Sequence, residues 1–200
     1  MMAQGWQWIS ATLLIACLAC FGWAMGRFFV QPAGLTTGMK VVKAFGVVFG
    51  LLHLAAIADT PGVPDLRGAS GAGLYLCALG LFWWAITASW RKPLSAAFSP
   101  DLPAHLVAHG PYKMIRHPLY CSYLLCWLAG WVTTGRLWLA PTLAVMLVIY
   151  VLAAAEEEKK FARSPFAQAY QRYRARTGLF LPNPFKLYLG SRKKFWQTAA

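Results

Sequence analysis

The chain has 200 residues and a formal net charge of +13, yet 58% of its residues are hydrophobic and only 12% are charged. Soluble domains usually carry about 25% charged residues, so this composition argues against a water-soluble protein and points to the lipid bilayer. Basic residues beside apolar segments usually meet anionic lipid headgroups, so the positive charge does not require a nucleic-acid partner.

Five apolar segments are expected to cross the membrane, because a spanning helix needs about 20 mostly apolar residues. They cover 8–30, 41–58, 70–90, 118–134 and 137–155. No lysine or arginine precedes Arg27, so we expect the first segment to be a retained membrane helix and not a signal peptide. The predicted fold is an all-α integral membrane protein with about five transmembrane helices and a C-terminal amphipathic helix at the interface.

A single membrane domain is expected to cover 1–200. Its parts are the first three helices (1–90), a cytoplasmic loop (91–117), a helical hairpin (118–155) and a cytoplasmic capping tail (156–200). With the N-terminus outside, 17 of the 19 basic residues lie in cytoplasmic segments, and Arg67 and Arg136 lie outside. The positive-inside rule then predicts a cytoplasmic C-terminus, and the expected location is a bacterial inner membrane.

Two features inside the membrane segments are expected to serve helix packing. Gly22–Gly26 and Gly46–Gly50 have the GxxxG spacing that lets helices approach closely, within one chain or, as the less favoured alternative, between two copies. His53 is an ionisable residue in the second segment, where such groups are often functional. We expect a neutral imidazole that is hydrogen-bonded between helices.

The connection 91–117 is long for a loop, and such loops are often functional. Prolines at 93, 100, 103 and 111 argue against a continuous helix through it. Asp101, His105 and His109 are spaced i, i+4 and i+8, which on a helix would make a metal-binding face. Because the prolines disfavour that helix, we expect no metal.

The motif RHPLY at 116–120 gathers polar groups where the fourth segment begins. Pro118 suits the first position of a helix, whose free backbone N–H groups and positive dipole end would favour an anion. Arg116 and His117 lie directly before it. The alternative is an interfacial cluster in which Arg116 touches lipid phosphate, and the residues alone leave the two open.

Glu156, Glu157 and Glu158 stand together where the fifth segment ends. They would form a solvated collar offset by lysines, or accept hydrogen bonds from a ligand's hydroxyl or ammonium groups. The short connection between the fourth and fifth segments predicts a hairpin, which would bring the glutamates close to RHPLY.

The tail is expected to form an amphipathic helix at the membrane surface. Ser164 and Pro165 are typical of a helix start, and Gly178 is typical of a helix end. Phe166, Tyr170 and Tyr173 recur on one face. A passive membrane anchor would use the same residues.

Three stretches together resemble the isoprenylcysteine carboxyl methyltransferase family and its bacterial relatives. They are LVAHGPYKMIRHPLY (106–120), EEKKF (157–161) and YQRYRARTGLFLP (170–182). Phosphatidylethanolamine N-methyltransferases share part of the pattern. The resemblance implies S-adenosylmethionine as cofactor and methyl transfer by in-line displacement to a lipophilic or membrane-associated acceptor at the cytoplasmic face.

Carried over by position, the resemblance implies a set of cofactor contacts. They are Leu106, Val107, Tyr112, His117, Pro118, Leu119, Tyr120 and Glu157. The candidate catalytic residues are Arg116, Glu158 and Tyr173; Glu158 would orient the site or contact the acceptor. The family has a basic residue one turn before the glutamates, and Ala153 stands there in this chain, so we do not expect a prenylcysteine acceptor.

Two other functions compete with methyl transfer. Membrane sterol reductases have a similar C-terminal design and use NADPH, which would replace the adenosyl cofactor. A non-enzymatic membrane scaffold would bind no cofactor and would tolerate loss of Glu157.

Overall fold

The computed structural model describes residues 2–29, 36–60, 65–91, 94 and 102–183. The chain forms α1 (Met2–Arg27), α2 (Thr37–Ala58), α3 (Asp65–Ser89), η1 (Gly110–Lys113), α4 (Pro118–Thr134), η2 (Leu137–Leu139), α5 (Ala140–Ala162) and α6 (Ala167–Arg174). No named strand occurs among the described residues, and an isolated bridge joins Ile115 to Gly178. The predicted all-α fold is confirmed.

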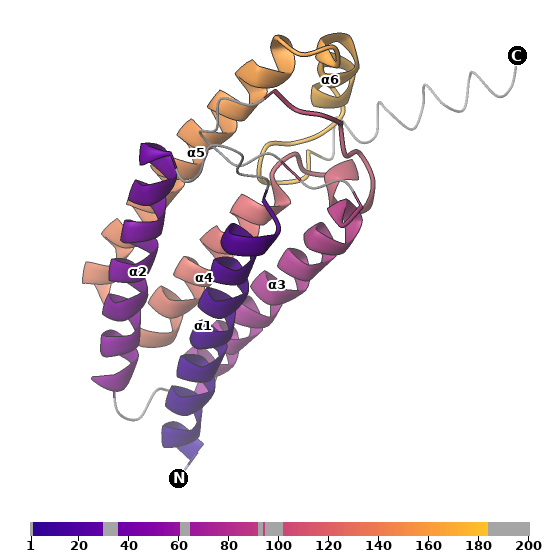
Figure 1. Cartoon of the computed structure of the whole chain (residues 1–200). Helices are drawn as coiled ribbons and strands as arrows, with labels where there is room; N and C mark the ends of the chain where they lie inside the picture. Colours follow the sequence, from indigo (N-terminus) through magenta and orange to yellow (C-terminus); the bar gives the residue numbers. More distant parts are fainter. Residues whose placement is uncertain (1, 30–35, 61–64, 92–93, 95–101, 184–200) are drawn as a thin grey trace, which may run out of the picture.

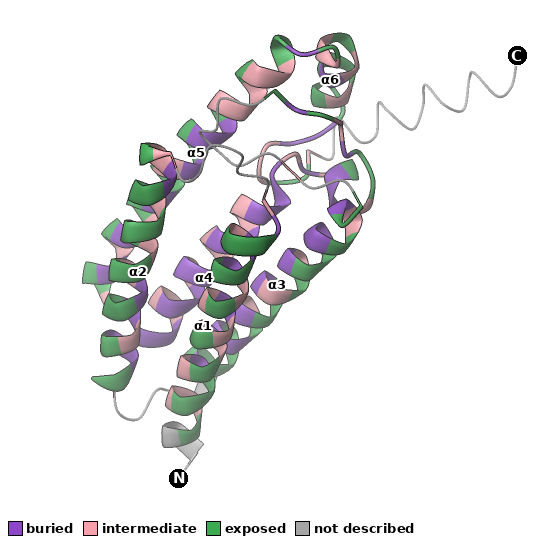
Figure 2. Ribbon diagram, in the orientation of Figure 1, coloured by how far each residue is buried: buried purple, intermediate pink, exposed green. Residues whose placement is uncertain are grey.

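The five long helices lie side by side and run alternately up and down, so that α6 and the segments before α4 meet at one end (Figure 1). α4 is the inner helix: it packs along α3 and also touches α1, α2 and α5. Ten of its residues are buried. The outward faces of the surrounding helices are largely exposed (Figure 2).

Four helical segments are long and apolar enough to cross a membrane, by length and composition. They are Gly5–Arg27, Thr37–Ala58, Leu66–Ser89 and Leu137–Ala162. α4 has 17 residues and spans about 25 Å, slightly less than the hydrocarbon core of a bilayer. Large apolar side chains such as Leu51, Leu76 and Val148 are exposed on the bundle, as lipid contact requires. The protein is therefore an integral membrane protein. The expected count of about five transmembrane helices is approximate, because four segments meet the length and composition criteria and α4 is shorter.

Helix packing uses one of the four expected glycines and others that were not expected. A Cβ on Gly50 of α2 would lie 2.8 Å from Cδ1 of Leu18 on α1, so the prediction that this glycine packs inside the monomer is confirmed. A Cβ on Gly22, Gly26 or Gly46 would meet no atom within 4 Å, so the same prediction is wrong for these three. A Cβ on Gly130 of α4 would lie 2.1 Å from Nδ1 of His53, so this position requires glycine. The expected interhelical bond of His53 is confirmed, because its Nε2 lies 2.9 Å from Oγ1 of Thr142 on α5.

The tail differs from the predicted helix at both ends. α6 begins at Ala167, because Oγ of Ser164 accepts the N–H of Phe166 at 3.1 Å in a turn before the helix. α6 ends at Arg174, so the prediction of Gly178 as the helix stop is wrong. Gly178 instead lies where the chain folds back: a Cβ there would be 1.7 Å from the carbonyl oxygen of Leu181.

Candidate functional site

The tail holds the segment that leads into α4. The backbone N–H of Arg116 donates to O of Gly178 at 2.9 Å, and the N–H of Gly178 donates to O of Met114 at 3.0 Å. The N–H of His117 donates to O of Leu179 at 3.2 Å. These three bonds fix the backbone on which the side chains of the RHPLY motif stand.

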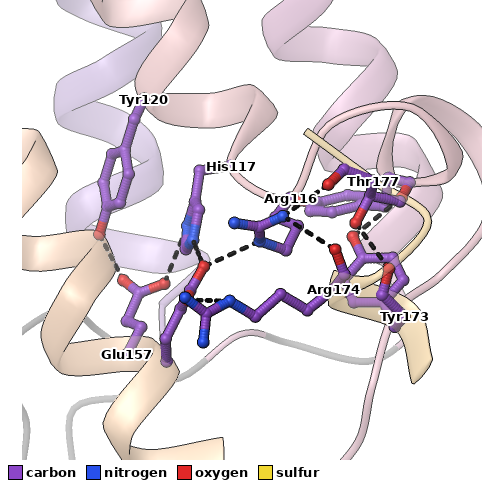
Figure 3. A network of polar contacts seen from close by, with 9 residues as sticks. Arg116, His117, Tyr120, Glu157, Tyr173, Arg174 and Thr177 are labelled. Carbon is purple, nitrogen blue, oxygen red and sulfur yellow. Dashed lines mark hydrogen bonds and ion pairs between the residues drawn. The ribbon is translucent and has the colours of Figure 1, made fainter. Parts of the chain in front are cut away.

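Arg116 is committed to contacts within the protein (Figure 3). Its Nε donates to Oε1 of Glu158 at 2.8 Å, and its guanidinium also donates to the carbonyl oxygen of Thr177 at 2.6 Å. Arg174 of α6 reaches the other oxygen of Glu158 at 3.2 Å. One carboxylate on α5 thus ties the start of α4 to α6, which supports the orienting role of Glu158.

His117 lies between two glutamates. Its Nδ1 is 3.4 Å from Oε2 of Glu157, and its Nε2 is 3.8 Å from Oε1 of Glu158, the latter an ion-pair contact too long for a hydrogen bond. Burial alone would lower the pKa of His117, but the interactions with the carboxylates of Glu157 and Glu158 outweigh it and raise the pKa. The arrangement therefore favours the imidazolium.

Tyr120 connects this pair to the bundle. Its hydroxyl donates a short hydrogen bond to Oε1 of Glu157, on the side away from His117 (Figure 3). Its ring stacks between His117, with ring centroids 5.5 Å apart, and Tyr150 of α5, at 5.2 Å. Glu157 is thus oriented from both sides by residues of the RHPLY motif.

The third glutamate differs from the other two. Glu156 pairs with Lys159 at 2.7 Å, and both side chains are exposed. This residue matches the solvated collar considered from the sequence. Glu157 and Glu158 match the alternative, in which the carboxylates are built into a polar site.

A pocket opens beside this network, between α4, α5, α6 and the segment 103–107. All eight predicted cofactor contacts line it: Leu106, Val107, Tyr112, His117, Pro118, Leu119, Tyr120 and Glu157. Arg116 and Tyr173 also line it, whereas Glu158 is not among the described lining residues. Tyr173 donates from its hydroxyl to the carbonyl oxygen of Tyr112 at 2.8 Å, which holds α6 against the pocket.

Sequence reasoning did not assign several other lining residues to the site. They are Phe29, Leu94, Pro103, Ala104, His105, Lys160, Phe161 and Tyr170. Phe161 and Tyr170 carried a signal in their apolar and aromatic spacing, and their rings stack with centroids 4.4 Å apart. Phe29 comes from the far end of the sequence, where no local pattern marks it.

The metal face considered from the sequence does not form at helical spacing. His105 and His109 lie in a non-helical segment, and Asp101 is outside the described residues. Within the described ranges, no group of three or more histidine, cysteine, aspartate or glutamate side chains could hold a metal ion.

The pocket wall combines hydrogen-bond donors with a carboxylate. No side chain caps the N-terminus of α4, so the first N–H groups of that helix remain available. Nε2 of His117 and the hydroxyl of Tyr112 are buried without a hydrogen-bond partner among the described residues. A ligand with a carboxylate at one place and hydroxyl or ammonium groups at another would satisfy both kinds of group.

The chain is similar to a known protein family and to several known proteins. A family described as phospholipid methyltransferase matches residues 66–169, just over half of the chain. The cobalt-zinc-cadmium resistance protein CzcN of Cupriavidus metallidurans is 32% identical over 118 residues, 59% of this chain and 49% of that protein.

Two methanethiol S-methyltransferases are also similar. That of Pseudomonas sp. (strain GM41(2012)) is 30% identical over 95 residues, 47% of this chain and 33% of that enzyme. That of Pseudomonas deceptionensis is 32% identical over 93 residues, 46% of this chain and 31% of that enzyme. The chain therefore spans about half of the length of CzcN and about a third of the two enzymes.

The range matched by the family includes the RHPLY stretch. Together with the two similar enzymes, this match bears out the resemblance to isoprenylcysteine carboxyl methyltransferase-like membrane proteins. Together with the membrane fold and the pocket, these similarities identify the chain as a member of the phospholipid methyltransferase family.

Proposed function

We propose that the protein is an S-adenosylmethionine-dependent methyltransferase that acts on a lipophilic acceptor at the cytoplasmic face of the membrane. The observation that carries the proposal is the pairing, on one pocket wall, of an uncapped helix N-terminus with the oriented carboxylate of Glu157. S-adenosylmethionine bound there would supply an electrophilic methyl group on its sulfonium.

The residues present suit the polar parts of this cofactor. The N-terminus of α4 and Nε2 of His117 would hold the methionine carboxylate. Glu157 would accept hydrogen bonds from the ribose hydroxyls, since a carboxylate has room for more than its two present partners. Tyr112, Leu106 and Val107 would form the wall beside the adenine.

The remaining candidate residues would position this site. Methyl transfer is a displacement in line with the breaking bond, so the protein chiefly supplies alignment and exclusion of water. Arg116 and Glu158 would hold α4, α5 and α6 together, and Tyr173 would hold Tyr112. Apolar residues such as Phe29 would keep water from the reacting atoms.

For the acceptor, we propose a small lipophilic thiol. Two similar proteins are methanethiol S-methyltransferases, which supports sulfur as the atom methylated. Ala153 is 1% exposed and packs in an apolar cluster with Met39, Met25, Phe29 and Tyr120. A charged acceptor carboxylate would find no basic partner at Ala153, which supports an uncharged acceptor.

We place the pocket on the cytoplasmic side of a bacterial inner membrane. α6 and η1 lie at the same end of the bundle (Figure 1). That end would be cytoplasmic by the positive-inside rule, because most basic residues of the sequence fall in the segments expected there. The N-terminus would then be outside.

The proposal is tested by transfer of a labelled methyl group. Membranes that contain the protein are incubated with methyl-labelled S-adenosylmethionine and either an alkanethiol, phosphatidylethanolamine or no acceptor. Label in the extracted thioether supports the proposal, and label in the phospholipid would move the acceptor to an amine. If neither acceptor yields labelled product, and the protein binds NADPH but not S-adenosylhomocysteine, the proposal is overturned in favour of a reductase.

A further inference from the structure

We propose that His105 is the general base that takes the proton of the acceptor thiol during methyl transfer. This inference rests on the proposed function and deepens it, because it concerns how a neutral thiol becomes the nucleophile. His105 lines the pocket together with Glu157 and Tyr120, and it is half-buried. No described residue forms a hydrogen bond or ion pair with its imidazole.

The other residues with ionisable basic or acidic side chains that line the pocket with His105 are unsuited to this role. They are Arg116, His117, Glu157 and Lys160. Arginine and lysine side chains carry donors and no acceptor. His117 is held toward its imidazolium by two carboxylates, and Glu157 already accepts from Tyr120 and would hold the cofactor.

The tyrosines that face the pocket are unsuited as well. Burial raises the pKa of Tyr112, Tyr170 and Tyr173 above the ordinary tyrosine value, so their hydroxyls keep their protons near neutral pH. The hydroxyl of Tyr120 donates to Glu157. Among the described lining residues, this leaves His105, because a neutral imidazole has one ring nitrogen that can accept a proton.

The step balances without a further reactant. The thiol proton moves to a ring nitrogen of His105 while the sulfur attacks the methyl carbon of the sulfonium. A new carbon–sulfur bond forms, and the old one breaks with its electron pair on the departing S-adenosylhomocysteine. The thioether leaves neutral, and the imidazolium returns its proton to water.

The test compares His105→Gln with His109→Gln, a matched control in the same segment. His109 is exposed and does not line this pocket. The rate of alkanethiol methylation by each purified protein in detergent is measured between pH 6 and 10, and so is its binding of S-adenosylhomocysteine. Loss of a general base should lower kcat/KM about 100-fold or more near pH 7.

The deficit of His105→Gln should shrink as the pH rises and the thiol ionises without help. It should also be small for an aromatic thiol that is already ionised at neutral pH. His109→Gln should follow the wild type throughout, and all three proteins should bind S-adenosylhomocysteine equally.

Three results would overturn the inference, and each would refute a different part of it. If the wild type methylates thiols and His105→Gln keeps both its rate and its pH profile, His105 is not the base. If the wild type binds S-adenosylhomocysteine but methylates no thiol, the acceptor class is wrong. If the wild type binds no S-adenosylhomocysteine, the proposed function itself fails.

Discussion

Nε of Arg116 lies 2.8 Å from Oε1 of Glu158, and this contact joins the segment before α4 to the C-terminal end of α5. Both side chains are largely buried. Because Arg174 binds the other oxygen of Glu158, the same carboxylate also holds α6. The two helices and the tail that form the pocket are therefore fixed relative to each other by one charged cluster.

Replacement of Glu158 by alanine should destabilise the protein by about 3 kcal/mol, because it leaves the buried charge of Arg116 without its partner. Thermal unfolding in detergent should show a lower Tm. The matched control is Glu156→Ala, two residues away on the same helix, where the exposed pair with Lys159 contributes little. Equal Tm values for the two variants would contradict a stabilising role for the ion pairs of Glu158.

The ion pairs of His117 should make stability depend on pH. Its pKa is raised in the folded protein, since Glu157 and Glu158 outweigh the effect of burial. A raised pKa adds stability that is fully present below the unfolded value of about 6.5 and is lost as the pH rises through the folded value.

The measurement is the difference in Tm between wild type and His117→Gln at several pH values from 6 to 9. The difference should be largest at pH 6 and should decrease toward pH 9. Arg116 and Arg174, which contact the same glutamate, are present in both proteins, so the comparison isolates the contribution of the imidazole. A difference that grows with pH would show that the imidazole is neutral in the folded state.

Gly130→Ala should destabilise the bundle by about 1–3 kcal/mol, because a new Cβ would meet His53 and Tyr75 at the packed interface. Gly73→Ala on α3 is the control, since a Cβ there meets nothing within 4 Å. Thermal unfolding of both variants checks the prediction. If both substitutions leave Tm unchanged, α4 does not pack as closely as described.

The contacts that the family resemblance implied line one pocket, and most of them lie in one short stretch of the chain. Seven of the eight predicted contacts fall within 106–120, so local order along the chain already brings them together. Glu157 required one further step, the hairpin of α4 and α5. Their place on one pocket wall agrees with the expectation, while their binding of a cofactor stays a prediction.

Other features depend on tertiary contacts that the spacing of apolar residues in the sequence does not predict. Gly178 pairs with Ile115 through an isolated bridge, which has neither the length nor the alternation of a strand. The GxxxG spacing marked glycines but not the direction they face, so Gly22 and Gly26 were expected inside and lie open. Phe29 reaches the pocket only because α1 ends beside it.

The most direct test of the account is calorimetric binding of S-adenosylhomocysteine to the purified protein in detergent. Glu157→Gln keeps the size of the side chain and removes its charge, and exposed Glu156→Gln makes the same change outside the pocket. Loss of a hydrogen bond to a charged group should weaken binding roughly 10- to 100-fold in Glu157→Gln. Glu156→Gln should bind like the wild type. Binding of NADPH in place of S-adenosylhomocysteine, or equal affinity in all three proteins, would contradict the account.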